Sequence, residues 1–149
     1  YMEFNEALKT VHYQHDQTPF ELNLGWLVDF NKPLFNGRKA LLLDKKNGPK
    51  YTLTKLDIEG NKPAEGSYIY GDKKCSLEIG YVTSAMWSPA VKANIAMAMI
   101  ETEYLQGEIW AEIYYEKELR QYDKVARCSI KEKPFWAPSR ARMTPPENY

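Results

Sequence analysis

Two histidines and two cysteines are the first residues to examine for chemistry, because imidazoles and thiolates bind metals and act as bases or nucleophiles. His12 and His15 are three residues apart, so on a helix their side chains would share one face. A metal site needs at least one further ligand, and the plain interpretation is a pair of polar helix residues. Cys75 follows two lysines, whose charges could lower the pKa of its thiol. No histidine is close to it in sequence, so we interpret Cys75 as a structural or exposed thiol.

Paired carboxylates are the second candidate, since two acids in different surroundings can act as general acid and general base. Three pairs stand two residues apart, which on a strand places both side chains on one face. None sits in an apolar run that would raise a pKa, so a solvated face is the simplest interpretation. The sequence also contains no glycine-rich phosphate loop, zinc-spaced cluster or serine elbow, and it therefore predicts no catalytic residue and no metal site. The pairs are Asp57/Glu59, Glu101/Glu103 and Glu116/Glu118.

The composition argues against several classes of protein. The 149 residues are 44% hydrophobic and 27% charged, which rules out a chain kept disordered by its charge. A net charge of zero argues against a nucleic-acid partner, and Trp110 and Tyr114 are expected in the core rather than stacked on bases. No apolar run approaches the roughly 20 residues that span a bilayer, so no membrane partner is expected. Two cysteines are too few for a disulfide framework, which favours a reducing compartment.

The elements that would position a site differ between the two parts of the chain. In the first 50 residues, helical spacing predicts a helix over 5–15, and alternation predicts a strand over 20–26. Apolar residues on both parities predict burial on both faces of 26–30. A second helix is expected through 40–43, ending at Gly48. A charged, structure-breaking run then marks a domain boundary.

From residue 51 to residue 130 the pattern is mostly β. Six short runs of β-branched, aromatic and aliphatic residues are separated by turn clusters, a spacing that predicts a sandwich or barrel. Both parities are apolar in 95–100, which predicts a central strand. The proline-rich segment 133–149 is expected to be irregular and to lie over a surface. The predicted strands are 51–58, 67–72, 76–85, 93–102, 108–116 and 123–130.

Three segments together carry a more specific signature. Residues 18–33 read TPFELNLGWLVDFNKP, residues 35–41 read FNGRKAL and residues 80–89 read GYVTSAMWSP. They resemble motifs of the glycine cleavage T-protein family: Pro-Phe-Glu-x-x-Leu-Gly-Trp followed by a basic residue, Phe-Ile-Gly-Arg-x-Ala-Leu, and Gly-x-Val-Thr-Ser-Gly-x-x-Ser-Pro. Pro134-Phe135 is similar to the closing Pro-Phe of that family. Order and spacing agree across nearly the whole chain.

The resemblance implies a tetrahydrofolate-dependent aminomethyltransferase or demethylase. In that family three domains surround a folate channel, and the last domain is a small β-barrel. The implied fold class is α+β, mainly β: residues 1–49 would be the end of the middle folate-binding domain, and residues 50–149 an antiparallel β-barrel with an irregular tail. The catalytic aspartate and the folate-anchoring glutamate of the family lie upstream. This chain is therefore expected to need the N-terminal part of the same polypeptide as its partner and to be inactive alone.

The resemblance also indicates residues that would contact tetrahydrofolate. Lys32 occupies the place of a basic residue that contacts the folate in the family, and a cation there suits the glutamate carboxylate of the folate tail. Trp26 is expected near the pterin channel or in the core. Trp136 and Arg140 belong to the region near the end of the chain that reaches the folate site in the family. No residue of this chain is assigned a catalytic role.

One position departs from the family motif. Ala85 stands where the family has glycine, and alanine would be strained if a turn there required positive φ. The neighbouring side chains are interpreted as turn-forming and packing residues at the barrel rim. These are Thr83, Ser84, Trp87 and Ser88.

Two other functions stay open at this point. A non-catalytic folate-binding protein of the same fold, acting in iron–sulfur cluster assembly, would carry its diagnostic cysteine motif upstream. An unrelated β-barrel interaction module would not bind folate at all. If the chain belongs to a transferase, its second partner is a small-molecule methyl or aminomethyl donor, and the expected location is the cytoplasm, or the mitochondrial matrix in a eukaryote.

Overall fold

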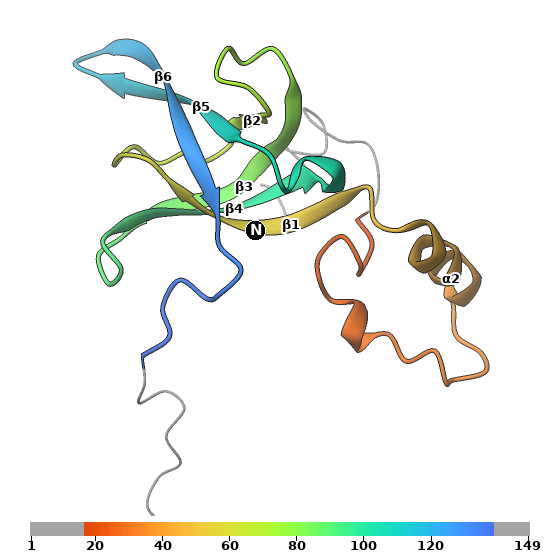
Figure 1. Ribbon diagram of the computed structural model, residues 1–149. Helices are drawn as coiled ribbons and strands as arrows, with labels where there is room; N and C mark the ends of the chain where they lie inside the picture. Colours follow the sequence, from red (N-terminus) through yellow and green to blue (C-terminus); the bar gives the residue numbers. More distant parts are fainter. Residues whose placement is uncertain (1–16, 139–149) are drawn as a thin grey trace, which may run out of the picture.

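One α-helix is followed by six strands in the part of the chain that the structure describes, residues 17–138 (Figure 1). The structure is a computed structural model. The helix predicted over 5–15, with His12 and His15, lies outside the described residues, as does the end of the predicted tail. The elements are η1 (Gly25–Leu27), α2 (Arg38–Asn47), β1 (Tyr51–Ile58), β2 (Tyr68–Tyr70), β3 (Glu78–Ser88), β4 (Ala93–Glu101), η2 (Thr102–Tyr104), β5 (Ile109–Lys117) and β6 (Arg120–Ile130).

All six predicted strands form, and they close into an antiparallel barrel in the order β1-β4-β3-β2-β5-β6. β1 pairs with β4 along its full length, from Tyr51 opposite Glu101 to Ile58 opposite Asn94. β4, the predicted central strand, lies between β1 and β3. Closure pairs the edges that an open sheet would leave exposed. The predicted fold class, mainly β with a short helical segment before a small antiparallel barrel, is confirmed.

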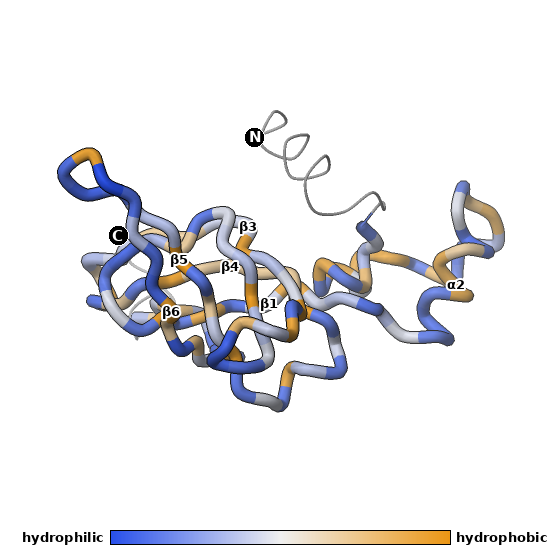
Figure 2. The backbone as a smooth tube through the Cα atoms, turned by 90° about the horizontal axis from the view of Figure 1, so that it is seen from above, coloured by the Kyte–Doolittle hydropathy of each residue, from blue (hydrophilic) through white to orange (hydrophobic). Residues whose placement is uncertain are grey.

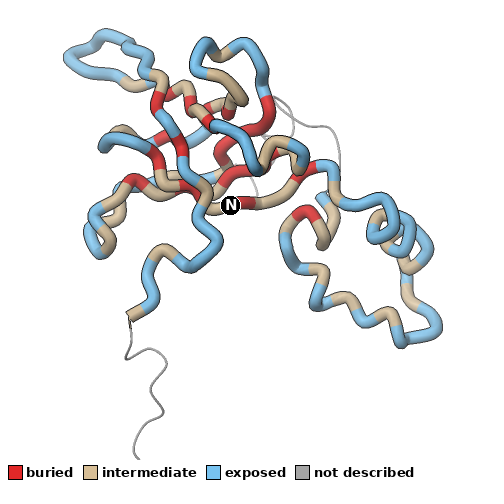
Figure 3. Tube along the Cα trace, viewed as in Figure 1, coloured by how far each residue is buried: buried red, intermediate tan, exposed pale blue. Residues whose placement is uncertain are grey.

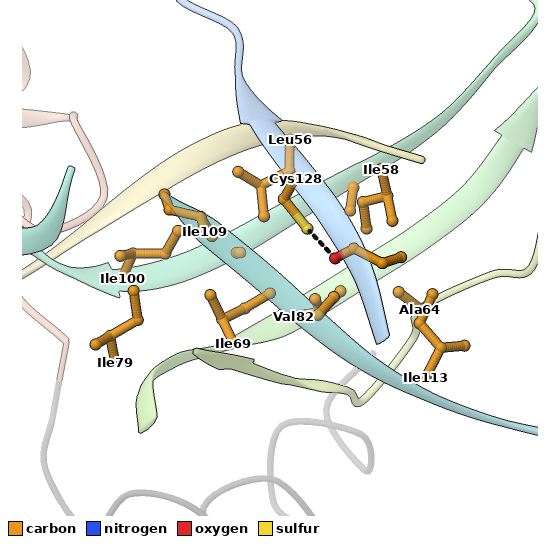
Figure 4. Packing of buried hydrophobic residues seen from close by; sticks show 14 residues of the cluster. Leu56, Ile58, Ala64, Ile69, Ile79, Val82, Ile100, Ile109, Ile113 and Cys128 are labelled. Atoms are coloured by element: carbon orange, nitrogen blue, oxygen red, sulfur yellow. Dashed lines mark hydrogen bonds between the residues drawn. The ribbon is translucent and has the colours of Figure 1, made fainter. Parts of the chain in front are cut away.

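Alternate residues of the strands point into the barrel and fill it (Figure 4). Aliphatic and β-branched side chains dominate this core, as expected for pleated strands that bury one face. Ala96 and Ala98 of β4 are buried there, and their small size lets other core side chains approach. Burying one large aliphatic side chain contributes roughly 1.5–3 kcal/mol, so the core is the main source of stability. The large hydrophobic side chains that are fully buried are Leu56, Ile58, Ile69, Ile79, Val82, Met99, Ile100, Ile109 and Ile113.

A single amide ties a loop to one end of the barrel. Asn94, at the start of β4, is buried, and its Nδ2 donates to the carbonyl oxygen of Lys62 at 2.7 Å. Ala64 of the same loop is fully buried against the core. Within the described residues the Asn94 Oδ1 has no hydrogen-bond partner. The loop between β1 and β2 is therefore held over the core by this side-chain hydrogen bond, by apolar contact and by backbone hydrogen bonds at its two ends, from Glu59 to Arg127 and from Val82 to Ser67.

The pairing and backbone of β3 explain the residue types at two positions of the GYVTSAMWSP segment. Gly80 lies opposite Ile100 of β4, and a Cβ added to Gly80 would come within 2.1 Å of the Met99 carbonyl oxygen. Glycine permits this close approach of two backbones. Ala85 lies inside β3 without a positive φ, so the strain considered for that position does not arise. The expected rim turn is wrong, because β3 continues to Ser88 beyond a shift of register near Thr83.

The strand predicted over 20–26 does not form. The backbone N–H of Thr18 donates to Glu21 Oε2 at 3.0 Å, and that of Glu21 donates to Thr18 Oγ1 at 3.3 Å, a reciprocal capping pair that starts a turn. Asn23 then has a left-handed φ of 58°, and the 3₁₀ helix η1 follows. The predicted burial on both faces beyond this point is also wrong, because Trp26 is 79% exposed.

α2 forms where it was predicted and is bounded by glycines. Gly37 precedes it with a φ of 83°, and Gly48 ends it with a φ of 80°. Both values are left-handed, which glycine adopts without a steric penalty. α2 buries none of its residues, and Leu42 and Leu43 are exposed. Figure 2 shows that α2, with its hydrophobic positions, lies away from the barrel.

Residues 17–49, here called the amino-side lobe, contact the outer surface of the barrel beside β1. The backbone N–H of Leu53 donates to the Glu21 carbonyl oxygen at 2.7 Å, and its carbonyl oxygen accepts from Asn23 Nδ2 at 2.7 Å. Figure 3 shows that the lobe is otherwise mostly exposed or half-buried. Leu22 and Leu53 pack against a small buried cluster of Tyr51, Tyr81 and Met99.

β5 and β6 extend past the barrel as a two-stranded arm over 114–123 (Figure 1). Their pairing with β2 and β1 is confined to residues 110–112 and 128–130. The turn at the tip consists of Glu118 and Leu119, with left-handed φ values of 53° and 61°. Two left-handed residues are typical of the tight turn that matches the twist of a hairpin. Leu119 is 94% exposed.

Candidate functional site

Trp26 and Lys32, the two predicted folate contacts in the amino-side lobe, are both exposed. Trp26 belongs to η1, and Lys32 lies in the turn that leads toward α2. An exposed tryptophan offers a flat apolar surface with a donor at its edge, which suits an aromatic ligand. Several other large apolar side chains of the lobe are exposed as well. They are Leu24, Leu27, Leu34, Leu42 and Leu43.

The turn that carries Lys32 is fixed through its backbone. The Asn31 N–H donates to Asp29 Oδ1 at 3.0 Å. The guanidinium of Arg38 spans the turn, with Nε donating to the Lys32 carbonyl oxygen at 3.2 Å and Nη2 to the Phe30 carbonyl oxygen at 3.3 Å. These bonds involve only the backbone of Lys32, so its side chain is left available for a ligand.

Aromatic side chains support this turn from within the lobe. The rings of Phe20 and Phe30 are parallel with centroids 6.4 Å apart, and Phe30 and Phe35 are tilted by 51° at 6.2 Å. The Lys45 ammonium lies 5.0 Å from the centre of the Phe30 ring, within cation–π range. Phe30 therefore anchors the turn to both the start of the lobe and the end of α2.

The surroundings of Lys32 are strongly basic. Residues 30–50 contain six basic side chains and one acid, Asp44. Within the described residues no carboxylate forms an ion pair with Lys32 or Arg38. Such an excess of positive charge raises the local concentration of anions. The donors therefore fit a carboxylate-bearing ligand. The basic residues are Lys32, Arg38, Lys39, Lys45, Lys46 and Lys50.

A groove of about 1050 Å³ lies beside this turn. It is lined by residues 33–40 and by Leu42, Leu43 and Lys46 of α2. A lining that combines apolar side chains with three cations suits an amphipathic occupant, such as a protein surface or the apolar part of a ligand.

Trp136 lies elsewhere. It is 62% exposed and follows β6, in a segment that leaves the barrel on the side away from the lobe (Figure 1). Residues 130–135 of this segment line a separate groove of about 790 Å³, which shares no residue with the groove of α2. The structure thus does not bring Trp136 together with Lys32. Arg140 lies outside the described residues.

The two thiols are not activated. Burial is the main cause that raises the pKa of Cys75, and the charges of Glu112 and Asp72 add to it. The lowering by adjacent lysines considered for Cys75 is therefore wrong. Burial raises the pKa of Cys128 to about 12, and its Sγ donates a weak hydrogen bond to the Ala126 carbonyl oxygen at 3.7 Å.

The other candidate groups have structural partners. Asp57 pairs with Lys131 at 3.3 Å, and Glu101 accepts a hydrogen bond from the Tyr51 hydroxyl at 3.1 Å. The expectation of a core position is wrong for Tyr114, which is 64% exposed. Trp110 is half-buried, with the Lys73 ammonium 5.7 Å from the centre of its ring.

In residues 17–138 no three His, Cys, Asp or Glu side chains are grouped as metal ligands. A search of the same residues finds no helix with the length and hydropathy needed to cross a membrane.

Sequence reasoning missed two residues of this framework. Arg38 was quoted only as part of a family motif, and its interaction with the backbone six and eight residues earlier has no pattern of its own. Gly80 was likewise quoted without a role, and only the pairing of β3 with β4 shows why a side chain cannot fit.

The fold and the site define a class of protein: a closed antiparallel barrel that carries an exposed, basic and aromatic lobe, without an activated nucleophile among the described residues. Residues 52–136 match the family model for the glycine cleavage T-protein C-terminal barrel domain. This match covers more than half of the chain, which therefore belongs to the glycine cleavage T-protein family.

Individual relatives agree with this assignment. The aminomethyltransferase of Caldanaerobacter subterraneus is 40% identical over 92 residues, which cover 61% of this chain and 24% of the relative. That of Herpetosiphon aurantiacus is 33% identical over 130 residues, 87% of this chain and 34% of the relative. The crystal structure of the glycine cleavage system aminomethyltransferase T from Bartonella henselae matches with a TM-score of 0.65 and 26% identity, covering 81% of this chain and 32% of that one. The chain thus spans about a quarter to a third of the length of these relatives.

Proposed function

We propose that this chain forms part of the folate-binding channel of a tetrahydrofolate-dependent one-carbon transferase, an aminomethyltransferase or a demethylase. The observation that carries the proposal is the exposed Lys32 side chain on a backbone-fixed turn, within a basic lobe that also exposes Trp26. Lys32 would bind the glutamate carboxylate of the folate tail through a charge-assisted contact. Trp26 would pack against the flat part of the ligand.

In the reaction of the full-length protein, reduced folate supplies the nitrogen that accepts the one-carbon unit from a methyl or aminomethyl donor. The role of this chain would be to bind and orient, because positioning alone can lower a barrier by several kcal/mol. The raised pKa values of the Cys75 and Cys128 thiols mean that neither is a ready nucleophile, which fits such a role. Trp136 and Arg140 stay candidate contacts from a second direction.

The lobe would also bind the N-terminal part of the same polypeptide. α2 has no buried residue, and Leu34 is 89% exposed although it lines the groove of α2. Exposed apolar patches of this kind mark interaction surfaces. The relatives are about three to four times longer than the matched region, so they contain enough chain to cover the patch.

We place the whole protein in the cytoplasm, or in the mitochondrial matrix of a eukaryote.

The test is Lys32→Ala in the full-length protein, measured as the dissociation constant for tetrahydrofolate with one and with three glutamates. Loss of a charge-assisted contact is expected to weaken binding by roughly 1–3 kcal/mol, and more for the triglutamate form. Lys74→Ala is the matched control, because Lys74 is an exposed lysine of the barrel outside the lobe. An unchanged dissociation constant for Lys32→Ala would remove this residue from the site.

The same titration separates the alternatives. Saturable folate binding without transfer to any amine, sulfonium or ether donor would favour the non-catalytic folate-binding protein. The unrelated interaction module is set aside by membership of the family.

A further inference from the structure

We propose that Arg38 is a positioning residue that holds the turn over residues 29–33 in the geometry in which Lys32 meets the folate tail. This inference rests on the proposed function. Its basis is the pair of hydrogen bonds from one guanidinium to the carbonyl oxygens of Phe30 and Lys32. Arg38 would act through Lys32 and would not touch the ligand itself.

The guanidinium suits this task because its donors form a rigid planar fork. Two of its nitrogens hold carbonyl groups two residues apart, so the backbone on both sides of Asn31 is fixed by one side chain. The hydrogen bond from the Asn31 N–H to Asp29 Oδ1 closes the same turn from the other side. Pro33 further restricts the backbone of Lys32. These constraints all act on the backbone of the turn, and no described carboxylate pairs with the Lys32 side chain.

The backbone of Arg38 is fixed as well. Arg38 is the first residue of α2, and its N–H donates to the Phe35 carbonyl oxygen at 3.2 Å. Gly37, with its left-handed φ, turns the chain so that the helix begins at this residue. No described carboxylate neutralises the guanidinium, so Arg38 also adds positive charge around the turn. Positioning and charge are two separable effects.

Arg38→Lys separates positioning from charge, because lysine keeps the positive charge but lacks the planar guanidinium that bonds both carbonyl oxygens. We expect Arg38→Lys in the full-length protein to weaken triglutamate folate binding roughly tenfold, since a turn that is competent about a tenth of the time raises the apparent dissociation constant by that factor. In the Lys32→Ala background the same substitution is expected to change binding less than twofold, because the group that Arg38 positions is gone. Lys39→Arg, one residue along α2, is the matched control.

A second readout does not depend on folate. Hydrogen exchange of the Asn31 amide is expected to accelerate at least fivefold in Arg38→Lys, with the exchange of the barrel strands unchanged. Faster exchange together with coupling to Lys32→Ala supports the proposal.

Three outcomes would overturn it: unchanged exchange at Asn31, an equal loss of affinity in both backgrounds, or wild-type binding by Arg38→Lys. If Lys32→Ala alone leaves folate binding intact, the Lys32 contact of the proposed function fails first, and the positioning role falls with it. If Lys32→Ala weakens binding but Arg38→Lys does not, only the positioning role is wrong.

Discussion

Replacing Gly80 by alanine introduces one methyl group at the closest approach of two barrel strands. The new Cβ would lie 2.1 Å from the Met99 carbonyl oxygen and 3.0 Å from the Ile100 Cα. Both contacts are with backbone, which cannot rotate away as a side chain can. β3 and β4 must therefore separate by roughly 1 Å at this point before the methyl group fits.

The cost follows from this separation. Overpacking a core position costs about 1–3 kcal/mol. Loss of one or two hydrogen bonds between β3 and β4, where Gly80 faces Ile100, adds about 1 kcal/mol each. Gly80→Ala is thus expected to lower the free energy of unfolding by about 2–5 kcal/mol, which for a chain of this size is a fall of roughly 4–20 °C in Tm.

The measurement is urea unfolding followed by circular dichroism and tryptophan fluorescence, with a thermal scan beside it. Gly107→Ala is the matched control, because its added Cβ would meet only the Tyr104 carbonyl oxygen at 3.5 Å, an ordinary contact. The control is expected to stay within about 0.5 kcal/mol of the wild type. A loss below about 1 kcal/mol for Gly80→Ala, or equal losses in both variants, would refute the close approach of β3 and β4.

Three further predictions concern a thiol, a turn and an amide. Burial raises the pKa of the Cys128 thiol from about 9 in the unfolded chain to about 12 in the folded one. As the pH rises through this window, the free energy of unfolding of the wild type should therefore fall by up to about 4 kcal/mol more than that of Cys128→Ala. Parallel dependences of the two free energies on pH would contradict the burial of the thiol. Leu119→Gly removes the steric cost of a left-handed leucine and should raise the free energy of unfolding in urea by about 0.5–1 kcal/mol. A lower free energy of unfolding would mean that the exposed Leu119 side chain makes a stabilising contact. Asn94→Ala leaves the Lys62 carbonyl oxygen without its donor and should lower the free energy of unfolding in urea by about 1–3 kcal/mol, whereas a neutral result would show that this hydrogen bond does not hold the loop.

The barrel was predictable from the sequence because its signal is local and repeated. Each strand run alternates or is apolar on both parities, and turn residues separate the runs. The structure of the amino-side lobe was not predictable in this way. Phe20, Leu22 and Trp26 stand at alternate positions, as on one face of a strand, but their side chains do not lie on one surface. Phe20 stacks on Phe30, Leu22 packs on the barrel, and Trp26 is exposed. A window of seven residues cannot distinguish these partners from one sheet face.

The candidate site was predictable only as far as the family motif reaches. The motif indicated Lys32, and the structure adds that its turn is held by Arg38, a contact that depends on where α2 begins. The resemblance named Trp136 as a second candidate contact because the end of the chain reaches the folate site in the family, whereas within the described residues its segment leaves the barrel away from the lobe that carries Lys32. Sequence order carries no information on which side of a closed barrel a tail leaves.

The arm of β5 and β6 has a consequence for the protein at high concentration. Beyond residues 110–112 and 128–130, the outer backbone groups of this hairpin are paired with no strand of the described chain, so each side could accept a strand from a neighbouring molecule. Charged side chains along it, among them Glu116, Lys117, Arg120, Asp123 and Lys124, oppose such self-association because stacking would strip them of water. Replacing these charged side chains by apolar ones would therefore make the edges of the hairpin more open to a strand from a neighbouring molecule.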